Sequence, residues 1–122
     1  MHWADHTAQR LSERDVPQVS CSGITPSGVF HIGHLREILS AEMIHRACLD
    51  AGLESRYVFI VDSMDPLRRV YDFLSPEYEH YIGHPLAYVP APGPNGEPGD
   101  GSVSYAEHFL APFVRAREQI GV

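Results

Sequence analysis

The chain has 122 residues, enough for one modest hydrophobic core and therefore for one domain. Hydrophobic residues make up 43% and charged residues 20%, as in ordinary globular proteins, and no apolar run approaches the roughly 20 residues of a membrane span. The formal net charge is −7 and the chain contains no lysine, so it has no general electrostatic attraction to nucleic acid.

The amino-terminal residues form neither a basic segment nor an apolar one. We therefore expect no signal peptide, no association with a membrane and a cytoplasmic location. The two cysteines, Cys21 and Cys48, are too few for a disulfide framework. We expect both to be small, buried side chains.

Helix and strand signals alternate in the first half of the chain. They predict a short helix over residues 7–13, a strand over 16–22, an amphipathic helix over 35–51 and a second strand over 57–61. Gly52 is expected to end the amphipathic helix. Its expected apolar face comprises Leu35, Ile38, Leu39, Met43, Ile44, Ala47 and Cys48. The second strand is a continuous apolar run, typical of a strand buried on both faces.

Beyond Asp62 the sequence signals for helices and strands become less regular. Residues 66–74 predict a turn or a short helix, and the Pro- and Gly-rich residues 85–101 predict loop. Ser104 and Glu107 have the spacing of a capping box, so a helix is expected to begin there. Pro112 lies inside this helix and is expected to kink it or split it.

Two strands joined by a helix form a βαβ unit, which predicts parallel pairing and a right-handed crossover. Two strands alone leave long unpaired edges and a thin core. The sequence therefore predicts an α/β fold that is the first half of a larger domain with a parallel sheet. The remainder is either missing or supplied by a partner, in which case self-association or a complementing chain would use the exposed sheet edge.

A glycine-rich turn over residues 23–34 joins the first strand to the long helix. Backbone N–H groups and the positive end of the helix dipole converge at such a junction, and histidines can add hydrogen bonds to phosphate oxygens. The turn therefore predicts a phosphate-binding loop. His31-Ile32-Gly33-His34 also spells the HIGH signature of class I aminoacyl-tRNA synthetases. The alternative is that His31 and His34 are surface or helix-capping residues.

Further segments narrow this resemblance to one family. Their order and spacing resemble the class I lysyl-tRNA synthetases over residues 1–5, 22–28, 31–33, 35–37, 65–70, 81–86 and 104–109. The resemblance implies a Rossmann-like (HUP-type) catalytic domain. Residues 1–122 would be its HIGH half, without the KMSKS half and without the anticodon-binding domain.

The same resemblance implies two-step chemistry. The carboxylate of L-lysine attacks the α-phosphate of ATP, with Mg²⁺ accompanying the nucleotide, and tRNA-Lys then takes the lysyl group. His31 and His34 would be the catalytic residues and would contact the phosphates. The ATP-binding residues would be Thr25, Pro26, Ser27, Gly28, His31, Gly33 and His34. No resident metal site is expected, and tRNA-Lys would be bound mainly by regions absent here.

Three residues match family positions that contact lysine: Gly23, Thr25 and Asp62. Gly23 would leave room for the substrate, Thr25 would offer a hydroxyl, and Asp62 would pair with the α-ammonium group. From the residues alone, Gly23 can equally be a turn glycine and Asp62 can cap the following turn. The chain departs from the family's usual pattern at Ser63, where a second aspartate is usual, and at His34, where asparagine is common.

Three functions are therefore compatible with the sequence. The first is the amino-terminal part of a class I lysyl-tRNA synthetase that binds ATP and is inactive alone. The second is a small HxGH nucleotidyltransferase. The third is a noncatalytic, synthetase-like remnant or binding module that pairs with another chain.

Overall fold

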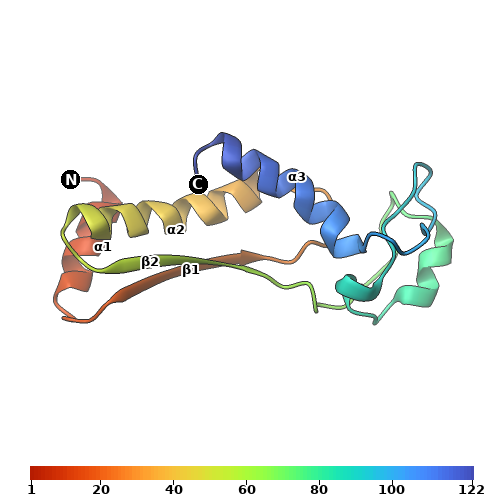
Figure 1. The fold of residues 1–122 in the computed structure, drawn as a ribbon, viewed down its shortest axis with the longest axis horizontal. Coiled ribbons are helices and arrows are strands. Elements are labelled where there is room, and N and C mark those ends of the chain that lie inside the picture. The colour runs from red at the N-terminus through yellow and green to blue at the C-terminus, as the bar shows by residue number, and fades with distance from the viewer. The chain divides into compact units, whose positions relative to one another are not determined.

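Three α-helices, two strands and two short 3₁₀-helices make up the structure, a computed structural model that describes all of residues 1–122 (Figure 1). In chain order these are α1 (Trp3–Ser12), β1 (Gln18–Ile24), α2 (Ile32–Asp50), β2 (Ser55–Val61), η1 (Pro76–Tyr81), η2 (Leu86–Tyr88) and α3 (Tyr105–Gln119). The chain divides into two units. The first comprises residues 1–24, 31–60 and 122, and the second comprises residues 25–30 and 61–121.

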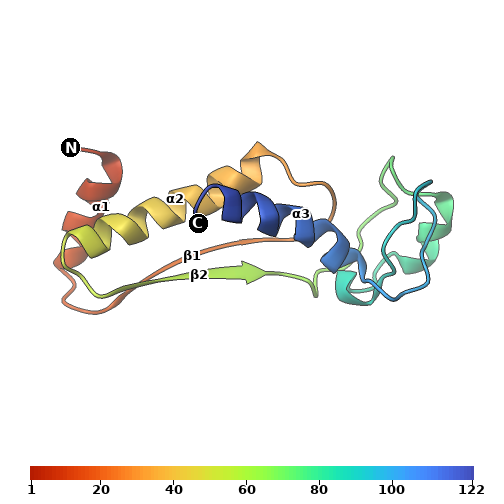
Figure 2. The same cartoon turned by 45° about the horizontal axis from the view of Figure 1, so that its top comes forward.

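The first unit is built on the predicted βαβ arrangement. β1 and β2 are hydrogen-bonded neighbours that run in the same direction, and α2 connects them (Figures 1 and 2). The predicted α/β class and parallel pairing are confirmed. The observed β1 begins after Pro17, which has no N–H group to donate to a neighbouring strand. Gly52 follows the C-cap of α2 with a φ of 77°, as predicted for a helix stop.

Both helices of this unit begin earlier than predicted. α1 begins at Trp3 because His2 and Asp5 form a capping box, and α2 begins at Ile32 because His31 and His34 form another. Histidine is not among the favoured N-cap residues, which explains why the sequence pattern placed both starts too late.

α2 covers the sheet with only part of its predicted apolar face. Ile38, Ala47 and Cys48 are buried, whereas Leu39 and Met43 are exposed, so the prediction is wrong for these two. Small side chains let α1 pack closely on α2. This cluster comprises Ala4, Ala8, Ala47 and Cys48.

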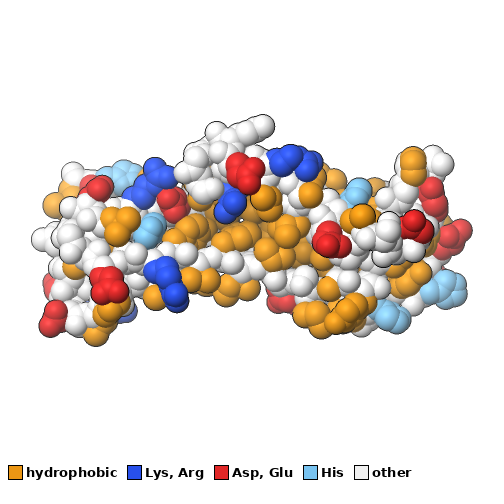
Figure 3. All heavy atoms as spheres, viewed as in Figure 1, with side chains coloured by type: hydrophobic (Ala, Val, Ile, Leu, Met, Phe, Trp, Pro, Cys, Tyr) orange, Lys and Arg blue, Asp and Glu red, His pale blue; other side chains and the backbone are white.

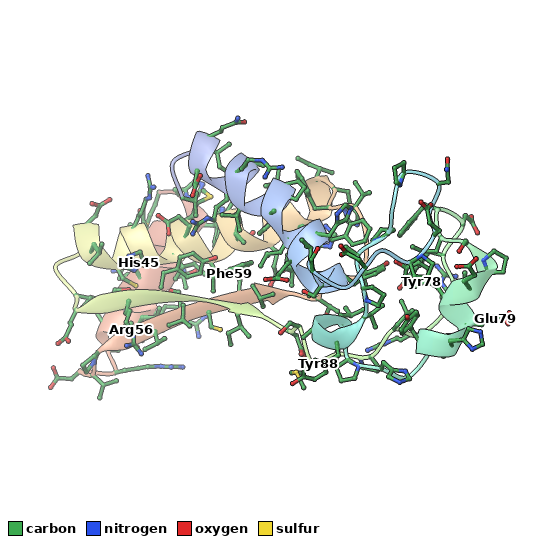
Figure 4. All side chains as sticks on the ribbon, turned by 45° about the vertical axis from the view of Figure 1, so that its right-hand side comes forward. His45, Arg56, Phe59, Tyr78, Glu79 and Tyr88 are labelled. Carbon is green, nitrogen blue, oxygen red and sulfur yellow. The ribbon has the colours of Figure 1, made fainter.

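The sheet is covered on one face only within this unit. Phe59 lies between β2 and α2, and the hydroxyls of Ser22 and Tyr57 are 2.6 Å apart (Figure 4). On the opposite face Val19 and Ile60 are more than half exposed, and Figure 3 shows apolar side chains at the surface along the strands. The prediction that β2 is buried on both faces is therefore wrong.

The two cysteines differ in their surroundings. Both are free thiols; Cys48 is buried, as predicted, but Cys21 is exposed. Successive residues of a strand point to opposite faces, and Ser22 points toward Tyr57, so Cys21 points to the uncovered face. The predicted burial of Cys21 is wrong for this reason.

The second unit is mostly irregular and has its own core. Residues 66–74 form no helix and contain one turn, at residues 71–74, and residues 85–101 are loop apart from η2. Isolated bridges join Pro66 to Pro85 and Pro90 to Ser104. The core comprises Leu67, Leu74, Tyr78, Leu86, Val89, Tyr105, Ala106 and Phe109. No helix in either unit is both long enough and apolar enough to cross a membrane.

α3 begins as predicted. Ser104 Oγ accepts the N–H of Glu107 (3.2 Å), and the Glu107 carboxylate accepts the N–H of Ser104 (2.9 Å). The helix runs through Pro112, so of the two outcomes predicted for this proline, a kink or a split, the split does not occur. A proline inside a helix removes one backbone hydrogen bond, and the rest of the helix continues around that gap.

Candidate nucleotide-binding site

The two histidines of the signature form the capping box of α2. His31 is the N-cap, and its Nδ1 accepts the N–H of Gly33 at 3.0 Å. Nδ1 of His34, at N3, accepts the N–H of His31 at 3.0 Å. The imidazole rings thus occupy the positions that Ser or Thr and Glu or Gln occupy in common capping boxes. The helix-capping role considered for both residues is present in the structure.

This arrangement fixes where the histidine protons lie. Each Nδ1 accepts a hydrogen bond, so in the neutral ring the proton sits on Nε2 and makes it a donor. Burial, and secondly the nearby His31 ring, lower the pKa of His34 below its ordinary value of 6.5. His34 is therefore neutral at pH 7 and can act as a hydrogen-bond donor rather than as a cation.

The ring of His31 leaves no room for a side chain at position 33, which is glycine. A Cβ at this position would lie 2.7 Å from Cε1 and 2.8 Å from Nδ1 of His31, closer than non-bonded atoms approach. Any side chain at position 33 would displace the ring and break the cap. The glycine between the two histidines thus has a local structural reason, independent of any ligand.

The preceding loop, Thr25–Phe30, belongs to the second unit. Ser27 N–H donates to the carbonyl of Thr25 (2.8 Å), which forms a tight turn around the buried Pro26. Thr25 Oγ1 donates to Asp65 Oδ2 (2.8 Å), and the hydroxyl of Tyr105 donates to the carbonyl of Ser27 (2.6 Å). The loop is therefore held by residues far from it in the sequence.

Two aromatic contacts complete the surroundings of this loop. Phe30 meets Phe113 edge to face, with ring centroids 5.6 Å apart. Gly28 lies against Phe73, where a Cβ would come within 3.2 Å of the ring. A larger residue at position 28 would push the loop away from Phe73.

The residues predicted to contact lysine have structural contacts of their own. Gly23 lies in β1 rather than in a turn, and a Cβ there would be 2.6 Å from the carbonyl oxygen of Ile60 in β2. Asp62 Oδ1 accepts the N–H of Asp65 at 3.2 Å, which is the turn-capping contact considered from the sequence. Thr25 is bonded to Asp65 as described. Their roles toward a substrate stay predictions.

The acidic and histidine side chains do not form a cation cage. No group of three or more His, Cys, Asp or Glu side chains is arranged to hold a metal ion.

Two residues of this site had no role assigned from the sequence. Asp65 and Tyr105 stand in segments that resemble the family, but nothing in their spacing from the loop predicts contact with it. The only local signal in the sequence is a tyrosine, Tyr105, at the start of an amphipathic helix. The structure buries this side chain, and a buried hydroxyl needs a hydrogen-bond partner.

Comparison with known proteins decides the family. The model of the family described as "tRNA synthetases class I (K)" matches residues 1–122, the whole chain. The chain belongs to this family. The resemblance drawn from the sequence is confirmed, as is the expected similarity to the amino-terminal half of a class I synthetase fold.

Relatives within this synthetase family are similar over the full length of the chain. The lysine--tRNA ligase of Archaeoglobus fulgidus is 47% identical over 122 residues, which are all of this chain and 24% of the relative. Lysine--tRNA ligase 1 of Methanosarcina acetivorans is 43% identical, and the lysine--tRNA ligase of Methanocaldococcus jannaschii is 44% identical. The chain covers 22% of each of these two, so it spans less than a quarter of the relatives' length.

Proposed function

We propose that this chain forms the ATP-binding, amino-terminal part of a lysine--tRNA ligase catalytic domain, the HIGH half. The histidine capping box of α2 is the observation that carries the proposal. It holds both Nδ1 atoms in hydrogen bonds and so makes each Nε2–H a donor at the start of a helix. A helix N-terminus favours phosphate, because its dipole attracts negative charge. The N–H groups of Gly33 and His34 already donate to His31, so the imidazole Nε2–H groups are the donors that we assign to phosphate.

The chemistry of lysine activation needs such donors. When the lysine carboxylate attacks the α-phosphorus of ATP, the bond to the bridging oxygen breaks and negative charge builds up on the leaving pyrophosphate. Donors that are already oriented stabilise this charge without reorganising. We assign this role to His31 and His34, and we assign ATP contacts also to Thr25, Pro26, Ser27, Gly28 and Gly33. Magnesium would enter with the ATP.

The lysine substrate would be held by Gly23, Thr25 and Asp62. Asp62 uses Oδ1 for the turn to Asp65, which leaves Oδ2 to accept from the α-ammonium group of lysine. tRNA-Lys would be bound mainly by parts of the ligase outside these residues, consistent with the net charge of −7. Charging of tRNA serves translation, so the proposal keeps the expected cytoplasmic location. Self-association through the open sheet edge stays a prediction.

The test separates phosphate binding from helix capping. Asn is a good N-cap, so His31→Asn keeps the acceptor for Gly33 N–H and removes the imidazole Nε2–H. His34→Gln likewise keeps an acceptor at N3. Both variants should fold with little change in thermal midpoint, and each should weaken MgATP binding about tenfold by calorimetry, as expected for loss of a hydrogen bond to a charged group.

His80→Asn changes an exposed histidine in η1 and should bind MgATP like the wild type. Absence of MgATP binding by the wild-type chain would refute ATP binding and favour the noncatalytic alternative. The chain alone should show no lysine-dependent ATP–pyrophosphate exchange above background. Robust exchange would overturn the view that the rest of the ligase is needed.

A further inference from the structure

The loop Thr25–Phe30 is tethered at three successive points within the second unit. Thr25 Oγ1 donates to Asp65 Oδ2 at 2.8 Å, and the carbonyl of Ser27 accepts from the hydroxyl of Tyr105 at 2.6 Å. The ring of Phe30 then meets that of Phe113. Every second or third residue of the loop is thus fixed by the segment Val61–Gly121.

The Tyr105 tether is rigid because the whole side chain is buried. Tyr105 is the first residue of α3, directly after the N-cap Ser104, and it is 0% exposed. Its ring centroid is 4.7 Å from that of Phe109 and 6.2 Å from that of Tyr78. Burial raises the pKa of Tyr105 far above its ordinary value, so the hydroxyl keeps its proton and stays a donor at neutral pH.

Hydrogen bonds of its backbone N–H and carbonyl fix the position of Asp65. The N–H of Asp65 donates to Asp62 Oδ1 (3.2 Å), and its carbonyl accepts from the N–H of Leu86 (2.9 Å). The carboxylate also lies 3.6 Å from the guanidinium of Arg68. Because its backbone is fixed on both sides, Asp65 presents its carboxylate to the Thr25 hydroxyl in one place.

We propose that Asp65 and Tyr105 are positioning residues that hold the Thr25–Phe30 loop in the conformation that receives the phosphates of ATP. This inference rests on the proposed function and deepens it, since it gives the segment Val61–Gly121 a role in the nucleotide site. A loop that contains glycine would otherwise lose conformational entropy each time it binds a ligand. Fixing it beforehand removes that cost from binding.

The test compares two tyrosines of the same core. Tyr78 is also 0% exposed, and its hydroxyl donates to the carbonyl of Pro90 at 2.9 Å (Figure 4). Tyr105→Phe and Tyr78→Phe each remove one buried hydroxyl and leave one carbonyl without its donor, so both should lower the thermal midpoint to a similar extent. Only Tyr105→Phe releases the loop.

The first readout needs no ligand. Hydrogen exchange of the Ser27 amide, which donates to the Thr25 carbonyl at 2.8 Å, should become about fivefold faster in Tyr105→Phe when measured by NMR, the factor expected for one hydrogen bond. It should not change in Tyr78→Phe. Unchanged exchange in Tyr105→Phe would overturn the proposal. Equal acceleration in both variants would overturn it as well, because the effect would then be general loss of stability.

A second pair of variants tests Asp65 in the same way. Asp65→Asn keeps an oxygen that can accept from the Thr25 hydroxyl, whereas Asp65→Ala does not, and both lose the ion pair with Arg68. Asp65→Ala should accelerate exchange of the Ser27 amide about fivefold, and Asp65→Asn should restore most of the protection. Equal protection in the two variants would overturn the role of Asp65.

The second readout is MgATP affinity of the full chain by calorimetry. Tyr105→Phe and Asp65→Ala should weaken binding about fivefold, Asp65→Asn should restore most of the affinity, and Tyr78→Phe should bind like the wild type. A loosened loop with unchanged affinity would overturn the link to the nucleotide. If the wild-type chain does not bind MgATP, the proposed function fails, and the exchange experiment by itself then decides whether these residues hold the loop.

Discussion

The contact between Gly33 and the ring of His31 makes the variant Gly33→Ala informative. At an ordinary helical position this change stabilises a protein by about 0.5–1 kcal/mol, because alanine loses less backbone entropy on folding. Here the new methyl group would lie 2.7 Å from Cε1 and 2.8 Å from Nδ1 of His31. The ring would have to rotate away, and the hydrogen bond between Nδ1 and the N–H of residue 33 would break.

The two effects should nearly cancel. Loss of an N-cap hydrogen bond costs about 1 kcal/mol, close to the gain from the alanine itself. We therefore expect Gly33→Ala to change the free energy of unfolding by less than about 0.5 kcal/mol in the wild-type background. In a His31→Ala background the cap is already absent, so the same change should stabilise the chain by about 0.5–1 kcal/mol.

Urea unfolding followed by far-ultraviolet circular dichroism measures all four corners of this double-mutant cycle. The coupling free energy between positions 31 and 33 should be about 1 kcal/mol and unfavourable to the combination of histidine and alanine. Equal stabilisation by Gly33→Ala in both backgrounds would refute the reasoning, since it would mean that the ring of His31 does not occupy the space above Gly33.

Two further predictions concern the helix caps. The pKa of His34 is lowered in the folded state, so the unfolded chain binds a proton at this residue more readily than the folded chain does. The free energy of unfolding should therefore fall as pH drops below 6.5, the pKa of the unfolded chain, and should level off below the lowered pKa of the folded state. His34→Asn has no proton to gain, so thermal melts between about pH 7.5 and pH 5 should show a smaller loss than in the wild type; an equal loss would contradict the assignment. Ser104→Ala removes the acceptor for Glu107 N–H and should lower the free energy of unfolding by about 1 kcal/mol in urea; a neutral effect would show that α3 does not depend on this cap.

Local sequence patterns predicted the ends of helices correctly where a residue type with a strong preference stands at the helix end. Ser104 and Glu107 set the start of α3, and Gly52 ends α2 with a positive φ that glycine adopts without strain. The starts of α1 and α2 were missed because His2 and His31 act as N-caps, a role that single-sequence propensities assign to other residues.

Burial was predicted less well than secondary structure. The apolar sequence of β2 predicts a strand that is buried on both faces. Such a sequence shows only that the side chains can be buried, and it does not show which other elements pack against the strand. Within the first unit α2 covers one face of the sheet, and Ile60 on the other face is 53% exposed. Periodicity identifies a face, and only the arrangement of neighbouring elements determines whether that face is covered.

The sequence by itself determined the βαβ order, the parallel pairing, the histidine signature and the family, because these depend on short motifs and on their order along the chain. The tertiary structure decided what holds the signature in place. Thr25 is hydrogen-bonded to Asp65, 40 positions away, and Ser27 is hydrogen-bonded to Tyr105, 78 positions away. These contacts depend on how the segment Val61–Gly121 folds back, and neither its irregular loops nor the periodicity of α3 indicates which distant residues its side chains contact.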